Sequence, residues 1–179
     1  AVMGLDKILE LIIEWIEKLL PFFIVKTWQK ADILRLGKIQ RTCDPGFHWR
    51  IPFVDENINL IVVTTTMETS AQTLVTADGQ DVTLQAVIKY SISDVVAYST
   101  EIYDATDAIM DFTMGTIMRE VNNHTYDECR DVEAVSNTIS KKVRAEVKKY
   151  GIHIDQITLT NFIKTRNYRI FRDMGGEIE

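Results

Sequence analysis

The residue types that most often carry out chemistry are scattered along this sequence. The three histidines, His48, His124 and His153, are far apart, and no spacing of histidine and cysteine resembles a known metal site. The two cysteines, Cys43 and Cys129, could supply a nucleophile only if folding brought one of them beside a histidine. We interpret both as structural thiols. Cys43 is the one candidate for acylation, because it alone lies near the apolar N-terminal segment.

Acidic residues and glycines give no stronger sign of catalysis. Asp78 and Asp81 are close in the sequence, but Gly79 lies between them, which is more typical of a tight hairpin turn than of a catalytic carboxylate pair. The sequence contains no glycine-rich phosphate-binding loop. We therefore predict a protein that is not an enzyme and has neither a metal site nor a cofactor.

The composition is that of a folded domain with an acidic balance. Of the 179 residues, 46% are hydrophobic and 26% are charged, which argues against disorder. Lys and Arg number 20 against 26 Asp and Glu, so the net charge is −6. Because neutralising phosphates requires a surplus of bases, we expect no nucleic-acid partner. Two cysteines are too few for a disulfide framework, and they fit a reducing compartment.

Residues 5–25, LDKILELIIEWIEKLLPFFIV, have the pattern of an amphipathic helix. At about 100° per residue the six charged side chains fall within an arc of about 120°, and the remaining surface is apolar. Pro21 ends or kinks this helix, and Phe22, Phe23 and Trp28 extend the apolar surface beyond it. The side chains of the predicted apolar face are Ile8, Leu9, Leu11, Ile12, Ile13, Trp15, Ile16, Leu19 and Leu20.

We interpret this segment as a helix that lies in the plane of a membrane, with Trp15 and Trp28 near the headgroups. The six charges between residues 6 and 18 disfavour a spanning helix, and the acidic start disfavours a signal peptide. A helix buried in the core of the domain, or in the groove of a partner protein, remains an alternative. The polar stripe holds four acids and two bases, so apolar area and not charge would have to drive binding.

The middle of the chain has the pattern of a β module. Gly37 marks a turn or bulge, Asp44-Pro45-Gly46 marks a turn, and Asp78-Gly79 marks a tight hairpin turn. Residues 82–92 alternate between apolar and mostly polar side chains, as a half-buried antiparallel strand does. The predicted strands are 33–39, 47–51, 57–69, 71–77 and 82–92, and Pro52 ends the second of them.

After residue 93 the apolar spacing becomes helical. Ser93 or Asp94 is the expected cap of a short helix, and residues 104–122 form a longer one. Thr125 and Glu128 form a capping box that is expected to open the helix ending before Gly151. That last helix carries five bases, for which a solvated face, a subunit contact and a lipid contact are the alternatives: Lys141, Lys142, Arg144, Lys148 and Lys149. A strand follows at 152–162, and the order of elements predicts an α+β domain.

Several short motifs, in this order and spacing, resemble the SPFH superfamily, the band 7 group of stomatin, prohibitin and flotillin. The resemblance extends over roughly residues 30–163. Its motifs are Arg35-Leu36-Gly37-Lys38, the run from Asp44 to Asp55 with Pro45, Gly46 and Pro52, the hairpin Asp78-Gly79, Arg119 in Met118-Arg119-Glu120-Val121, and Gly151 in Tyr150-Gly151-Ile152.

The resemblance implies a membrane-associated protein that forms homo-oligomers and contacts membrane lipid on the cytoplasmic face. It also implies a scaffold role without catalysis, or, as an alternative, a regulatory subunit that binds a membrane protease or channel. We expect a membrane-associated segment at 1–29, an SPFH domain at 30–164 and a tail at 165–179. Family members usually continue into a coiled coil, and no sustained charged heptad follows Lys164 in this sequence.

Overall fold

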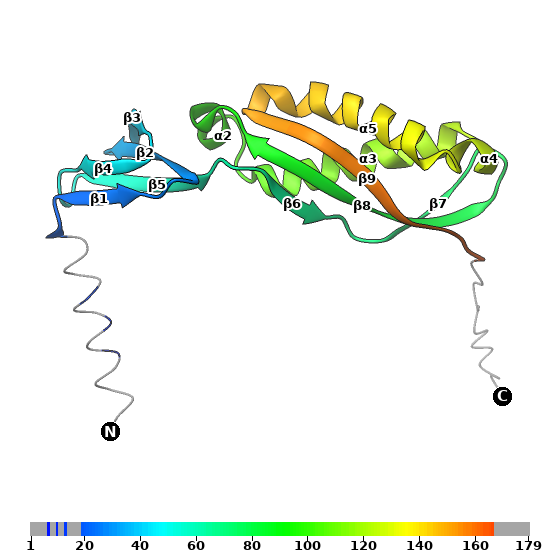
Figure 1. Cartoon of the computed structure of the whole chain (residues 1–179), viewed down its shortest axis with the longest axis horizontal. Coiled ribbons are helices and arrows are strands. Elements are labelled where there is room, and N and C mark those ends of the chain that lie inside the picture. Colours follow the sequence, from blue (N-terminus) through cyan, green and yellow to red (C-terminus); the bar gives the residue numbers. More distant parts are fainter. Residues whose placement is uncertain (1–6, 8–9, 11–12, 14–18, 167–179) are drawn as a thin grey trace, which may run out of the picture.

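The computed structural model describes Lys7, Glu10, Ile13 and residues 19–166 of the chain. It confirms an α+β fold with antiparallel sheets. Figure 1 shows a small all-β lobe at one end of an elongated molecule and a larger lobe, in which helices cover a sheet, at the other. The strands of the small lobe are β1 (Phe22–Val25), β2 (Gln29–Arg35), β3 (Lys38–Cys43), β4 (Gly46–Trp49) and β5 (Asp55–Ile61).

The small lobe contains two sheets around a very small core. β1 pairs with β4, and β2 lies between β3 and β5 in a three-stranded sheet. Phe23 packs against the four hydrophobic side chains that this lobe buries, which are Val25, Ala31, Ile33 and Cys43. So few buried side chains leave most of the apolar surface of the lobe uncovered.

Both predicted turns of the small lobe are present, but the prediction of one strand over 33–39 was wrong, because the first of these turns divides it into β2 and β3. Gly37 and Leu36 form the turn between β2 and β3, and both have positive φ angles, of 78° and 51°. Two successive positive φ angles are what a two-residue hairpin turn requires. The turn at residues 44–46 connects β3 to β4.

The prediction of one strand over 57–69 was wrong. β5 ends at Ile61 and a separate strand, β6 (Thr65–Glu68), begins four residues later. β5 pairs with β2 in the small lobe, whereas β6 pairs with the long strand of the larger lobe. The break is therefore the point at which the chain passes between lobes, and no glycine or proline marks it.

The larger lobe is built around its central strand, β8 (Asp81–Ile92). β6 and β7 pair with successive parts of β8, and β9 pairs along nearly its whole length. The predicted alternation in β8 is confirmed, because Val82, Leu84, Ala86 and Ile88 are buried. The other elements of this lobe are β7 (Gln72–Val75), α2 (Val95–Thr100), α3 (Ala105–Asn123), α4 (Tyr126–Cys129), α5 (Val132–Val147), η1 (Lys148–Tyr150) and β9 (Ile152–Lys164).

Side chains of α5 close the outer edge of β9. Ser140 Oγ accepts from the N–H of Ile157, and Ser136 Oγ accepts from the N–H of Leu159. Arg144 donates to the carbonyl oxygens of two residues at the start of the strand, Ile154 and Asp155. A strand edge that is satisfied in this way cannot pair with a strand of another molecule.

The predicted caps are present, with one correction. Asp94 caps α2, and Thr125 and Glu128 form the predicted capping box. That box opens only the single turn α4, however, and not the long helix that follows. Asp131 accepts from the N–H of Ala134 and caps α5. A second capping side chain only six residues after Thr125 allows the chain to end one helix and start another.

Gly151 joins the beginning of β9 to the end of β8. Its carbonyl oxygen accepts from the backbone N–H groups of Ser93 and Asp94, and its φ angle is +71°. A Cβ atom at this position would lie 2.2 Å from the carbonyl oxygen of Asp94. Glycine is therefore required here both by backbone conformation and by space.

We expect Gly151→Ala to lower the free energy of unfolding by about 1–3 kcal/mol or more, because it adds backbone strain and a clash. Gly115→Ala is the matched control, since Gly115 lies inside α3 with open space around its Cα. The control should raise the free energy of unfolding by about 0.5–1 kcal/mol. Urea unfolding of the two variants measures both, and equal effects would contradict this account of Gly151.

Candidate functional site

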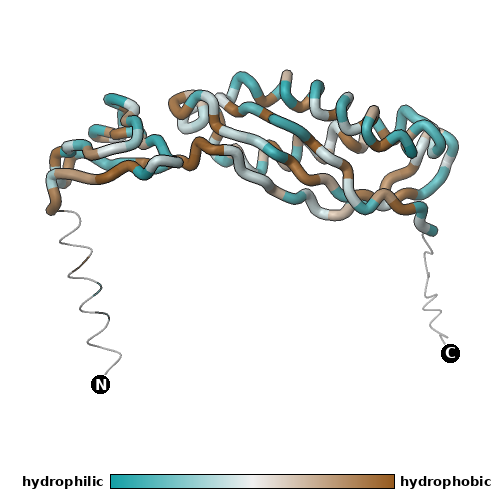
Figure 2. Tube along the Cα trace, in the orientation of Figure 1, coloured by the Kyte–Doolittle hydropathy of each residue, from teal (hydrophilic) through white to brown (hydrophobic). Residues whose placement is uncertain are grey.

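The small lobe exposes an unusual amount of apolar surface. Ten large apolar side chains are exposed between residues 22 and 63, against five between residues 64 and 166. Figure 2 shows hydrophobic residues along a strand of the small lobe and through the segment that leads to the larger lobe. We call the ten side chains the apolar surface: Ile24, Trp28, Leu36, Phe47, Trp49, Ile51, Phe53, Val54, Ile61 and Val63.

An aromatic cluster forms one part of the apolar surface. β1 and β4 place Phe22 opposite Trp49 in their register, and the Phe22 ring stacks on Phe47 with 5.3 Å between centroids. Trp49 meets Phe47 edge to face at 5.5 Å and is 63% exposed. These contacts hold a large tryptophan ring in one place while most of its surface faces outward.

Two loop tips form another part, and both have an unusual backbone. Phe53 has a φ angle of +65° and is 72% exposed, and Leu36 has a φ angle of +51° and is 84% exposed. Positive φ angles are rare for large side chains and cost about 1–3 kcal/mol, so they persist only where the surroundings enforce them. The Leu36 N–H lies 3.5 Å from the carbonyl oxygen of Val54, which joins the two tips.

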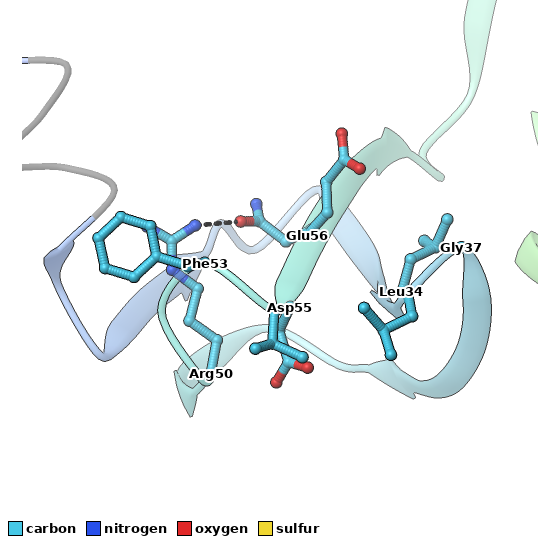
Figure 3. Close-up of a pocket in the computed structure, with 9 residues that line it drawn as sticks. Leu34, Gly37, Arg50, Phe53, Asp55 and Glu56 are labelled. Carbon is cyan, nitrogen blue, oxygen red and sulfur yellow. Dashed lines mark hydrogen bonds between the residues drawn. The ribbon is translucent and has the colours of Figure 1, made fainter.

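The two tips border a hollow of about 560 Å³. Figure 3 shows Leu34 and Gly37 on one side of it, Arg50 and Phe53 on the other, and Asp55 between them. The walls combine aliphatic and aromatic carbon with charged groups.

An ion pair holds the loop that carries Phe53. Arg35 donates from Nε and Nη2 to the two carboxylate oxygens of Asp55, at 2.7 and 3.1 Å, and the N–H of Ile51 donates to Asp55 Oδ2 at 2.9 Å. The side chain of Asp55 is only 3% exposed. The Arg35 hydrogen bonds, followed by that from Ile51, lower the pKa of Asp55 to about 2. The carboxylate therefore stays charged, and the loop stays fixed, at any ordinary pH.

Arg50 ties this loop to the segment that enters the lobe. Its N–H donates to the carbonyl oxygen of Pro21 at 2.8 Å, and its Nε donates to that of Leu20 at 3.2 Å. Its Nη1 donates to Asn57 Oδ1, a bond drawn in Figure 3. The N-terminal segment therefore enters the lobe beside the loop that carries Phe53.

A buried carboxylate connects the two lobes. Asp32 is fully buried in β2 and accepts from Thr42 Oγ1 at 2.7 Å within its own sheet. It also accepts from Ser99 Oγ at 3.2 Å, and Ser99 belongs to α2 of the larger lobe. This contact links the small lobe directly to α2 of the larger lobe.

The predicted membrane-binding residues fall into three groups. Ile13, Leu19, Leu20 and Trp28 are exposed. Phe22 and Phe23 are half-buried in β1, in a strand that lies within the segment we assigned to the membrane. The remaining six lie outside the described residues: Ile8, Leu9, Leu11, Ile12, Trp15 and Ile16. Among the described residues, no helix is both long enough and apolar enough to cross a membrane.

The family-motif residues do not converge on one site. Gly37, Pro45 and Pro52 lie in the turns and loops of the small lobe, and Gly46 and Asp55 are the first residues of β4 and β5. The other four lie in the larger lobe, with Asp78 and Gly79 at the β7–β8 turn, Arg119 on α3 and Gly151 before β9. The motif residues therefore mostly set the backbone conformation at turns and element ends, and they do not form a shared binding site. The pairing of Arg35 with Asp55 was missed, although their opposite charges on neighbouring strands were a usable signal.

Most of the histidine and cysteine side chains that could take part in chemistry are hydrogen-bonded to nearby backbone or buried. The rings of His48 and His124 bind the backbone carbonyls of Asp44 and Glu120. Cys43 is 3% exposed, and burial raises the pKa of its thiol. A buried thiol of raised pKa is a poor nucleophile, so Cys43 is not accessible for acylation as it stands.

The predicted basic face, which the structure divides between α5 and η1, is only partly solvated. Lys142 pairs with the buried carboxylate of Glu120, and Arg144 is bound to the β9 carbonyls. Lys149 lies over the ring of Tyr150. Among the described residues, Lys141 and Lys148 make no ion pair, so the available positive charge of this helix is smaller than its sequence suggests.

Residues 23–170 match the profile of the family described as SPFH domain / Band 7 family. The chain is 24% identical to Protein HflK of Borreliella burgdorferi over 181 residues, covering 88% of this chain and 58% of that protein. It is 23% identical to Stomatin-1 of Caenorhabditis elegans over 138 residues, covering 76% of this chain and 42% of the relative. It is 34% identical to Modulator of FtsH protease HflC of Escherichia coli K12 over 83 residues, covering 42% of this chain and 25% of the relative.

The ion pair leads to a prediction about stability and pH. Asp55→Asn should lower the free energy of unfolding by about 1–3 kcal/mol at neutral pH, because it removes the negative charge that accepts hydrogen bonds from Arg35 and from the N–H of Ile51. A carboxyl whose pKa falls on folding stabilises the protein above its ordinary pKa of 3.8 and loses that effect as the pH falls through about 2. In urea unfolding at several pH values, the difference between the two proteins should therefore be constant above pH 3.8 and shrink below it. A difference that does not change with pH would contradict this role.

Proposed function

The chain belongs to the SPFH domain / Band 7 family, and from this premise we propose that it is a non-enzymatic, membrane-associated scaffold. In this proposal the apolar surface and the N-terminal segment bind one leaflet of a membrane. Copies of the chain then associate with one another and organise lipid or membrane proteins around them. The side of the membrane on which the larger lobe lies, expected above to be the cytoplasmic face, stays a prediction.

One observation carries the membrane part of the proposal. The small lobe holds large apolar side chains outward on a rigid frame, with Phe53 and Leu36 at loop tips whose backbone is strained. Burying one such side chain in an apolar medium contributes about 1.5–3 kcal/mol. Scattered apolar residues on a surface need no explanation, but a gathering of this size in one lobe is typical of a binding surface.

The larger lobe supports the scaffold part of the proposal. Its hydrophobic core is buried within the lobe. Side chains of α5 bond to the backbone of β9 along residues 154–159, which prevents strand pairing between copies through that edge. Self-association would then use a surface other than this edge of β9. Attachment of several copies to one membrane also multiplies their effective affinity, because each bound copy holds its neighbours close to the surface.

A second candidate function is regulation of a membrane-bound protease. The relative from Escherichia coli is named as a modulator of the FtsH protease, although the similarity covers only 42% of this chain. In this alternative the N-terminal helix and the apolar surface dock into a partner protein, and lipid is incidental. Binding to protein-free vesicles separates the two candidates, because only the first requires it.

The first test removes the two loop tips from the apolar surface. We expect Leu36→Asn with Phe53→Asn to weaken binding of the full chain to phosphatidylcholine vesicles by about tenfold or more for each side chain. Asn tolerates positive φ angles, so the loops should keep their conformation. Tyr103→Asn is the matched control, because Tyr103 is a fully exposed aromatic residue of the larger lobe. Flotation equal to that of the control would refute the proposed contact.

The N-terminal segment gives an independent test. Ile12→Glu or Ile16→Glu places a charge on its predicted apolar face. We expect either variant to be released from vesicles in flotation, because burying a carboxylate in the acyl region costs several kcal/mol, while circular dichroism shows the domain still folded. Variants that float as well as the parent protein would show that this segment does not lie in the membrane.

A further inference from the structure

A second hollow of the small lobe gathers three arginines. It measures about 400 Å³ and is lined by Arg35 of β2, Arg41 of β3 and Arg50 of the loop after β4. Asp55 is the single carboxylate in its lining among the residues that the structure describes, and the hydrogen bonds from Arg35 and Ile51 already occupy that carboxylate. Among these described residues the hollow therefore carries an excess of positive charge.

The guanidinium groups of Arg35 and Arg41 are held in place and keep donors for a further ligand. Arg35 uses its Nε and Nη2 on Asp55, and Arg41 uses Nη2 on the carbonyl oxygen of Trp49 at 2.7 Å. A guanidinium has five N–H donors, so both side chains have donors beyond these bonds. Planar forks of this kind suit the oxygen atoms of a phosphate, which they can bind in pairs.

The net charge of the small lobe also favours an anionic ligand. Residues 21–63 contain six Lys and Arg against four Asp and Glu, a net charge of +2 in a chain whose total is −6. Two of those four acids, Asp32 and Asp55, are buried. The part of the molecule that bears the apolar surface is thus the part that would be attracted to an anionic membrane.

Apolar side chains border the same hollow. Trp49 and Ile51 line it, and both belong to the apolar surface. A ligand that fits this border would join an anionic group to a hydrocarbon part. A lipid that lies in the leaflet beside the small lobe has both.

We propose that the three-arginine hollow binds the phosphate group of an anionic phospholipid, whose acyl chains pack against Trp49 and Ile51. The inference rests on the proposed function, because it assumes that the small lobe contacts a membrane. It adds a site that recognises charge to a surface that otherwise binds by apolar area. Free phosphate shares the same chemistry and is distinguished by the experiment.

The experiment compares vesicles of phosphatidylcholine with vesicles that also contain phosphatidylserine, using the full chain at constant ionic strength. Arg41→Lys keeps the charge and removes the fork, and Lys38→Gln removes a charge from an exposed position of β3 that does not line the hollow. We expect Arg41→Lys to lose most of the preference for anionic vesicles, about fivefold or more. Lys38→Gln should lose clearly less than Arg41→Lys, because it removes only the diffuse attraction of one surface charge outside the hollow.

A second variant tests the site without changing Arg41, in case Arg41→Lys alters the local fold. Gln40 lines the hollow and is exposed, so Gln40→Glu adds a negative charge there without removing any arginine. It should abolish the preference for anionic vesicles and leave binding to phosphatidylcholine vesicles unchanged. A preference retained in both Arg41→Lys and Gln40→Glu would overturn the proposal.

Two further outcomes are decisive. If inorganic phosphate removes the preference when chloride of equal ionic strength does not, the hollow is a site for soluble phosphate, and the lipid assignment is wrong. Failure of the proposed function looks different, because the parent protein would then not bind phosphatidylcholine vesicles at all. The comparison of anionic with neutral vesicles would still report whether the arginines select for charge.

Discussion

The ion pair between Arg35 and Asp55 is the interaction on which the arrangement of the small lobe depends. The two residues face one another in the register of β2 and β5, and the Asp55 carboxylate also binds the backbone of Ile51. This fixes both ends of the loop that carries Phe53. The same loop is bonded through Arg50 to the segment that enters the lobe. One buried carboxylate therefore sets the positions of the loop tip, the arginine hollow and the N-terminal segment relative to one another.

The two lobes differ in the number of hydrophobic side chains that each buries. The larger lobe buries sixteen hydrophobic side chains in one cluster, whereas the small lobe buries four. Two short sheets cannot enclose all the apolar residues that their strands carry, so the remainder stays outside. A membrane would cover this remainder, and the hydrogen bond between Asp32 and Ser99 would connect the larger lobe to the membrane-bound lobe.

Much of the fold could be predicted from the sequence, because its signals are local. The alternation in β8, the turn at Gly37 and the caps at Asp94 and Thr125 depend on neighbouring residues. The break between β5 and β6 could not be predicted, since the β-branched run continues while the pairing partner changes.

The candidate site was predicted only in part for the same reason. The sequence indicates an apolar N-terminal segment, but it does not show that Leu36 and Phe53 have positive φ angles or that three arginines meet. Those features arise from pairing between strands that are distant in the chain, and periodicity carries no information about them.

The most direct test of the account is the depth of Phe53 in a membrane. A nitroxide label at Phe53→Cys would be compared with one at Tyr103→Cys, on the full chain bound to vesicles. The two native cysteines are buried and should not react with the label. The account predicts that the label at 53 becomes accessible to oxygen and protected from a water-soluble relaxation agent, whereas the label at 103 stays in water. Equal exposure of both labels to water on bound protein would contradict the central claim that the small lobe enters the membrane.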